Sequence, residues 1–403
     1  MRILKIKCFA MPLIFLVLVV LAITCGGFVP CGLKSLFYTI SLIIKDCLIF
    51  SLPFLIFSLI YNSVSKLGDG ALKFIMIIVP LVCCSNFVNT LISYATSLVF
   101  IGSETISAVK TDADALILTP MFQMNLPKLI SNDFALLSGI LCGLVAGFAK
   151  NKNLNGINLF FSRFQSYFFR ILTPIMPFFI LGTTLKLQHE GMLATICSNY
   201  LSILSIFALS AYGWVLLQFA LLSSFKIDNL TEYIRNITPA VITGFGSMSS
   251  SAALPLSVKA AEGNCFDKNN AAVIVPVTVN VHLVGDCFFI PLTAIAVAIS
   301  FGHGFPSFSS YLLFAFYFVL AKFAVAAVPG GGILVMLPVL QTYLGFNADM
   351  LGLITAIYVL FDSFITACNV AGNGAMAMIF DRITYRIGWK KVVAEKSDED
   401  ILK

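Results

Sequence analysis

Long apolar segments limit this chain to a membrane fold. Segments such as Phe9 to Phe28 and Phe134 to Ala149 reach or approach the roughly 17 to 25 apolar residues with which an α-helix crosses about 30 Å of hydrocarbon. Hydrophobic residues make up 59% of the 403 residues and charged residues 11%, against about half and about a quarter in soluble domains. The sequence therefore predicts an all-α polytopic membrane protein that folds in the lipid bilayer.

Eight of the apolar segments are continuous and predict eight transmembrane helices. We place these spans at 9–29, 36–64, 71–101, 129–149, 158–185, 193–225, 264–300 and 349–388. Two further apolar stretches, 230–260 and 308–347, are broken near the middle by residues that disrupt helices. We interpret these two as re-entrant helical hairpins, because nonhelical backbone at membrane depth is tolerated only beside protein or a wet cavity.

The positions of the basic residues support this topology. If the N-terminus is cytoplasmic and both hairpins return to the side they entered from, most of the 25 Lys and Arg residues lie on or near the inner face. We therefore expect a multi-pass protein of the cell inner membrane with cytoplasmic N- and C-termini. The formal charge of +6 does not predict nucleic-acid binding, since the basic residues form short clusters between apolar segments.

The first apolar run has two interpretations. Arg2, Lys5 and Lys7 ahead of it are typical of a signal peptide, and Cys25 permits a lipoprotein. The run is longer than a usual signal core and is followed by a poor processing site, so we favour an uncleaved first helix.

The sequence contains no pattern typical of an enzyme. It has no nucleophile and base pair, no phosphate-binding glycine loop, and no spacing of its eleven cysteines with histidines that fits a transition metal. We therefore expect no cofactor, and we interpret the cysteines as reduced packing residues.

The first broken stretch reads ITPAVITGFGSMSSSAALPLSVKAAE and is interrupted by glycines and by the three serines Ser249, Ser250 and Ser251. Two short helices that meet at a serine tip explain this pattern. Free amides at the start of a half-helix, together with hydroxyl groups, form a site for a carboxylate. The alternative is a Ser/Gly helix-packing face, which is common in membrane helices.

The second broken stretch has Pro329, Gly330, Gly331 and Gly332 between apolar arms. A helix cannot continue through this run, and three glycines allow a close approach to a ligand and the opening of a gate. A plain loop between two spans is the alternative, which the distribution of basic residues disfavours.

The last span carries a polar stripe. Asp362, Thr366, Asn369 and Asn373 are spaced four, three and four residues apart, so their side chains share one helix face. A carboxylate inside a membrane is costly, and it normally faces a partner, an ion or a substrate. The alternative is that helix-packing hydrogen bonds satisfy Asp362.

The span between the two hairpins contains PVTVNVHLVGD, with Asn280, His282, Gly285 and Asp286 in an apolar frame. We expect a polar break in this helix. His282 titrates near neutral pH when unperturbed and is a candidate proton carrier, although a packing role is as common. Asp286 is a candidate for binding a cation or a proton.

This order of hairpins and polar helices resembles the dicarboxylate/amino acid:cation symporter family, the glutamate-transporter-like proteins. The resemblance is most specific over 237–382, in SSSAALPLSVKAAE, VPGGG and DSFITACNVAGN. It implies a homotrimer with inverted repeats and an elevator-type mechanism. Residues 1–225 are then mostly scaffold and trimerisation helices, with spans 3 and 6 partly in the transport domain; 226–388 form the transport core and 389–403 a cytoplasmic tail.

The resemblance also implies roles for single residues. The two tips line the carboxylate of an amino acid substrate, Asp362 receives its ammonium group, and Thr366 and Asn369 complete the pocket. The implied substrate-binding set is Ser249, Ser250, Ser251, Gly330, Gly331, Gly332, Asp362, Thr366 and Asn369. The candidates for coupling to Na⁺ or H⁺ are Asn280, His282, Asp286, Asn369 and Asn373.

One departure from the family bears on the substrate. Members that carry acidic substrates have an arginine three residues after the aspartate, whereas this chain has Ile365. A second carboxylate buried there without a basic partner is badly desolvated, while a neutral side chain suits isoleucine. We therefore expect symport of small neutral amino acids; symport of a dicarboxylate or an acidic amino acid is the alternative.

Other departures bear on the coupling ion. Asn373 replaces a carboxylate of the family, and His282 and Val284 stand where the family has Asp and Thr. Either fewer sodium ions are used, or protons on Asp286 or His282 replace them. Lys322 offers a tethered positive charge at an ion position, but we favour the interpretation that it snorkels to the outer interface.

Two further classes of protein stay open. An anion-conducting, channel-like relative is one, and a non-transporting sensor is the other. The closed pocket around an aspartate disfavours the channel, and the altered ion residues favour the sensor.

Overall fold

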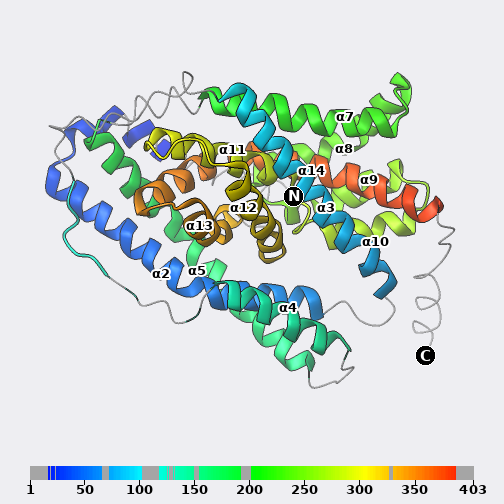
Figure 1. Cartoon of the computed structure of the whole chain (residues 1–403), viewed down its shortest axis with the longest axis horizontal. Helices are drawn as coiled ribbons and strands as arrows, with labels where there is room; N and C mark the ends of the chain where they lie inside the picture. Colours follow the sequence, from blue (N-terminus) through cyan, green and yellow to red (C-terminus); the bar gives the residue numbers. More distant parts are fainter. Residues whose placement is uncertain are drawn as a thin grey trace, which may run out of the picture.

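The structure is a computed structural model of the whole chain. It describes residues 17–18, 20–22, 24–65, 72–101, 118–124, 126, 130, 132–148, 154–191, 201–325 and 330–386. Across these residues all regular structure is helical (Figure 1).

Three helices form a first group along one edge of the molecule (Figure 1). They are α2 (Cys31–Ser65), α4 (Asn132–Phe148) and α5 (Leu154–His189). α2 packs along α5 and against α4. The contact between α2 and α5 is close because Gly182 has no side chain: a Cβ there would lie 2.8 Å from the Cβ of Ser41 and would meet the carbonyl oxygen of Phe37.

The long helix α14 (Ala348–Arg386) is the centre of a second group. The helices packed on it are α7 (Gly213–Leu222), α8 (Ile227–Ser247), α9 (Ser250–Asn264), α10 (Lys268–Thr278), α11 (Val284–Ser300) and α13 (Gly331–Leu344). α3 (Leu72–Phe100) packs against α11 and α12 (Phe308–Ala321). Most of α14 is buried and its sequence is apolar on most faces, as expected of a helix surrounded by others.

Several helices have the length and composition of membrane spans. Among the described residues, Ile77–Phe100, Leu201–Leu222 and Ala348–Arg386 are long and apolar enough to cross a bilayer. α2, α3, α4, α5 and α14 begin and end within a few residues of predicted spans. The predicted spans at 9–29 and 193–225 lie partly outside the described residues.

The predicted span at 264–300 is two helices rather than one. α10 ends at Thr278 and α11 begins at Val284, so a nonhelical segment separates them. This is the polar break that the sequence predicts around Asn280 and His282.

Both broken stretches are pairs of helices that pack on each other. α8 and α9 meet at Met248 and Ser249, where Met248 has a left-handed backbone (φ 50°) and the Ser249 hydroxyl accepts a hydrogen bond from the Ala252 N–H. α12 continues into the 3₁₀ turn η4 (Lys322–Ala324), and α13 begins after Gly330, whose φ is 73°. Pro329, which we predicted at the second break, lies outside the described residues.

The packing of α2 on α5 leads to a first prediction. Gly182→Ala should lower the unfolding temperature of the purified protein, because the new methyl group meets a backbone carbonyl that cannot rotate away; overpacking of this kind costs about 1 to 3 kcal/mol. Gly213→Ala is the matched control, since a Cβ on Gly213 has no neighbour within 4 Å. Equal unfolding temperatures for the two variants would contradict this account of the interface.

Candidate functional site

Two buried carboxylates lie where the hairpins, the polar break and the polar stripe converge. Asp286, in the first turn of α11, is 1% exposed, and Asp362, in the middle of α14, is 3% exposed. A carboxylate is expensive to bury unless a cation or hydrogen-bond donors face it. The partners of these two groups therefore define the chemistry of the site.

Asp286 has a full set of partners. The Lys322 Nζ lies 2.8 Å from Asp286 Oδ2, and both side chains are buried. The Tyr358 hydroxyl and the Asn369 amide each donate a hydrogen bond to Asp286 Oδ1 at 3.0 Å. The ammonium also lies 4.4 Å from the centre of the Phe318 ring, a favourable cation–π distance. The charge of this carboxylate is thus balanced within the protein.

The interpretation that Lys322 snorkels to the outer interface is wrong. Lys322 is 0% exposed and its ammonium group points to a carboxylate inside the protein. Gly332 makes this approach possible, because a Cβ on it would meet both the Tyr358 hydroxyl and Asp286 Oδ2. The Asp286 carboxylate and the Phe318 ring together compensate the Lys322 ammonium for the water that it would contact at the membrane interface.

Among the described residues, Asp362 has hydrogen-bond donors but no cationic partner. The Gly330 N–H donates to Asp362 Oδ2 at 2.8 Å, and the Thr366 hydroxyl donates to Asp362 Oδ1 at 3.0 Å. Within the part of the chain that the structure describes, no lysine, arginine or histidine forms an ion pair with it. This carboxylate is therefore a buried negative charge that suits a cationic ligand.

The glycine-rich tip is directly beside Asp362, whereas the serine tip approaches the next turn of α14. Gly330 contacts Asp362, and Gly331 and Gly332 begin α13 in buried positions. A Cβ on Gly244, near the end of α8, would lie 2.9 Å from Val370 Cγ2 and 3.6 Å from the Thr366 carbonyl oxygen.

The three serines differ in exposure. Ser249 is half-buried and caps α9, Ser250 is buried, and Ser251 is exposed. The described hydrogen bonds of Asp362 go to Gly330 and Thr366 rather than to these serines.

The polar break is held by α3. The Asn86 amide donates to the Val281 carbonyl at 2.7 Å, and its oxygen accepts from the Leu283 N–H at 3.4 Å. His282 Nε2 lies 2.9 Å from the Ser85 hydroxyl. Within the segment, the Val281 and His282 N–H groups both donate to the Thr278 carbonyl, and the two side chains of α3 satisfy further backbone and side-chain groups.

The candidate ion-coupling residues have different hydrogen-bond partners. Asn369 is joined to Asp286, both through its amide and through the Asp286 N–H, which donates to Asn369 Oδ1 at 3.3 Å. Asn373 instead accepts a hydrogen bond from the Thr278 hydroxyl. Asn280 Oδ1 is buried and has no hydrogen-bond partner among the described residues. A cation held near Asn280 or Asn373 would meet neutral oxygens.

Sequence reasoning missed Tyr358, Asn86 and Ser85. Tyr358 precedes Asp362 by four residues and so extends the polar stripe by one turn, a signal that the spacing rule supplies. Asn86 and Ser85 are adjacent polar residues within an otherwise apolar span, which is itself a sign of a polar partner.

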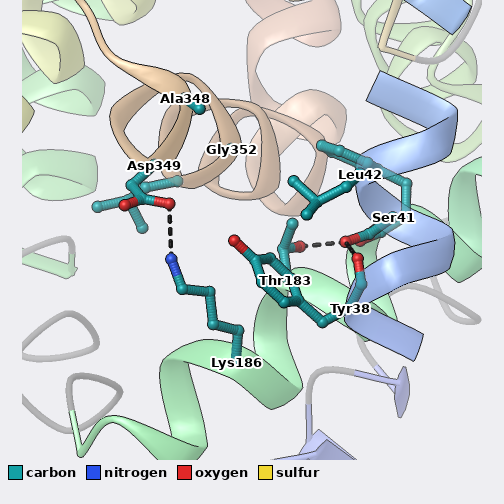
Figure 2. Close-up of a pocket in the computed structure, with 10 residues that line it drawn as sticks. Tyr38, Ser41, Leu42, Thr183, Lys186, Ala348, Asp349 and Gly352 are labelled. Atoms are coloured by element: carbon teal, nitrogen blue, oxygen red, sulfur yellow. Dashed lines mark hydrogen bonds and ion pairs between the residues drawn. The ribbon is translucent and has the colours of Figure 1, made fainter. Parts of the chain in front are cut away.

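Two cavities elsewhere do not suit an amino acid. One, between α2, α5 and the start of α14, has a volume of about 30 Å³, which suits a water molecule (Figure 2). In it Lys186 of α5 points toward Asp349 of α14, with its Nζ 2.6 Å from Asp349 Oδ1. The other, about 620 Å³, lies between α2, α4 and α5 and is lined mostly by phenylalanines, an environment that disfavours a zwitterion.

The fold, with several helices long and apolar enough to cross a bilayer, is that of an integral membrane protein. The chain belongs to the sodium:dicarboxylate symporter family, whose sequence model matches residues 7–383. Membership confirms the predicted family and places the chain among transporters rather than enzymes.

Individual relatives are more distant. The chain is 26% identical over 220 residues to an uncharacterized symporter of Haemophilus influenzae, covering 53% of this chain and 48% of the relative. It is 26% identical over 250 residues to excitatory amino acid transporter 1 of Ambystoma tigrinum, covering 60% and 45%. It is 28% identical over 156 residues to excitatory amino acid transporter 5 of Mus musculus, covering 38% and 28%. The chain thus spans about half the length, or less, of these curated relatives.

The contact between α3 and the polar break leads to a second prediction. Asn86→Ala should lower the unfolding temperature, because it leaves the Val281 carbonyl and the Leu283 N–H unpaired in a buried place, at a cost of about 1 to 3 kcal/mol for each group. Ser97→Ala is the control on the same helix, since among the described residues the Ser97 hydroxyl donates to the Ser93 carbonyl of α3 itself. A variant as stable as this control would show that Asn86 does not hold the break.

Proposed function

We propose that this protein is a secondary-active symporter that carries a small neutral amino acid together with a cation, sodium or a proton. The observation that supports this most is Asp362, a buried carboxylate that has a backbone amide and a hydroxyl as partners but no ion pair among the described residues. An amino acid supplies an ammonium group for this carboxylate. Its own carboxylate suits the amides at the starts of α9 and α13.

The proposed architecture has eight spans and two re-entrant hairpins in the cell inner membrane, with both termini cytoplasmic. α8 to α14 would form the transport core, assisted by α3 and α7, and would move like an elevator against α2, α4 and α5 in a homotrimer. The packing supports this division, because helix contacts within each of the two groups are far more extensive than the contacts between them.

The substrate class rests on Ile365 and Lys322. Ile365 is 0% exposed and offers no charge to a second carboxylate. Lys322 already forms an ion pair with Asp286. An acidic side chain would therefore be buried without a partner, which is costly.

The second candidate function is symport of a dicarboxylate or an acidic amino acid. The description of the family names dicarboxylates, and two of the relatives are named excitatory amino acid transporters. This candidate requires a basic partner for the second carboxylate that the residues named here do not provide.

The role of Asp362 gives a third prediction. Asp362→Asn should reduce amino acid uptake and counterflow in proteoliposomes by about 30-fold or more, because the ammonium loses its buried counter-charge while the shape of the side chain is kept. Asp228→Asn, an exposed carboxylate in the first turn of α8, should transport like the unaltered protein. Wild-type uptake by the Asp362 variant would remove this residue from the site, and absent counterflow in the unaltered protein would favour a pore or a sensor.

The role of Ile365 gives a fourth prediction. Ile365→Arg should raise inhibition by aspartate or glutamate, relative to inhibition by alanine, about tenfold or more in a competition assay, because it supplies the missing basic partner. Ile365→Leu should keep the original order of substrates. If the arginine variant inserts and folds but ranks substrates as before, the placement of Ile365 beside the substrate side chain is incorrect. If the unaltered protein already prefers acidic substrates, the second candidate function holds.

A further inference from the structure

The Asp286–Lys322 ion pair joins three separate parts of the second helix group. Asp286 comes from the start of α11, Lys322 from the turn η4 after α12, and the two other donors to Asp286 from α14. The pair lies beside the part of α14 that carries Asp362, because Tyr358 and Asn369, which donate to Asp286, are four residues before and seven residues after Asp362. Two buried carboxylates thus share one region, and among the described residues only Asp286 has a cationic partner.

The ammonium of Lys322 covers one oxygen of the Asp286 carboxylate. It is in contact with Asp286 Oδ2, it is completely buried, and the other carboxylate oxygen is filled by the Tyr358 hydroxyl and the Asn369 amide. The glycine at 332 leaves no side chain between them. A sodium ion from solution can reach this carboxylate only if the ammonium leaves.

We propose that Lys322 is the resident counter-cation of Asp286, so that the protein itself supplies one positive charge that would otherwise be taken from solution as an alkali cation. This inference rests on the proposed symport and specifies its ion requirement. In the unaltered protein Asp286 does not bind sodium, and Asp362 is the carboxylate whose charge a ligand neutralises.

The proposal predicts a gain of sodium binding when the lysine is removed. Lys322→Ala leaves the buried Asp286 carboxylate and the nearby Tyr358 hydroxyl beside an empty space, and carboxylate and hydroxyl oxygens are ligands for Na⁺. The half-maximal sodium concentration for thermal stabilisation of the purified variant, with choline chloride as the reference salt, should be at least tenfold lower than that of the unaltered protein. Lys322→Ala/Asp286→Asn should lose this gain, and Lys322→Arg should not acquire it.

Lys186→Ala is the matched control, because Lys186 also pairs with a carboxylate, Asp349, but in a partly exposed place. It should show no gain in sodium dependence. A Lys322→Ala variant without added sodium dependence overturns the proposal, and so does a gain that persists in the double variant. Loss of proton-driven uptake without any gain in sodium dependence would identify Lys322 as a proton carrier and would equally overturn it.

A neutral replacement of the pair keeps the proposal testable if Lys322→Ala does not fold. Lys322→Met/Asp286→Asn removes both charges at nearly constant volume and should fold and bind amino acid, because no charge is left to balance. If this variant fails to fold, charge balance is not the role of Lys322. Thermal stabilisation by sodium is measured without transport. Absence of amino acid uptake by the unaltered protein would therefore refute the proposed function, and the stabilisation measurement would still decide the role of Lys322.

Discussion

The arrangement of the whole site depends on the electrostatic cost of burying Asp286. In an apolar interior a carboxylate that loses its partner is destabilising by about 3 to 5 kcal/mol, which is a large part of the stability of a typical domain. Lys322, Tyr358 and Asn369 therefore have to stay in place together. These side chains come from η4 and from two different turns of α14. Their contacts with Asp286 therefore hold the hairpin of α12 and α13 against α14, and this places the Gly330 N–H beside Asp362.

Glycines make this convergence possible as much as charges do. A Cβ on Gly285 would meet the Ile365 carbonyl and would lie 3.1 Å from Asn369 Oδ1, so any larger residue would push α11 away from α14. Gly332 has the same effect between α13 and the Asp286 carboxylate. The two carboxylates have the same chemistry but different surroundings, since Asp286 faces an ammonium group whereas the described partners of Asp362 are a backbone amide and a hydroxyl.

Features with a local signal could be predicted from the sequence, whereas long-range partners could not. The serine and glycine interruptions break helices, and the spacing from Asp362 to Asn373 defines one face of a helix. The end of α8, the start of α9, the start of α13 and the stripe on α14 therefore follow from short segments. The partner of Lys322 is 36 residues away, and Asn86 meets the break across 195 residues, so both depend on tertiary packing. The snorkelling interpretation failed because it considered only the position of Lys322 near the end of an apolar helix.

Two of the described ion pairs differ in how much their separation costs. Lys186–Asp349 bridges the first and second helix groups, but the Asp349 side chain is 53% exposed, and exposed pairs contribute only about 0 to 1 kcal/mol. Asp286–Lys322 lies wholly within the second group and is fully buried, so its separation is far more costly. Moving η4 away from α11 and α14 would break the buried pair and is therefore strongly opposed. Moving the second group as a unit against α2 and α5 would break only the partly exposed pair and is opposed much less. This difference supports the proposed elevator-type movement over a movement in which η4 leaves α11 and α14.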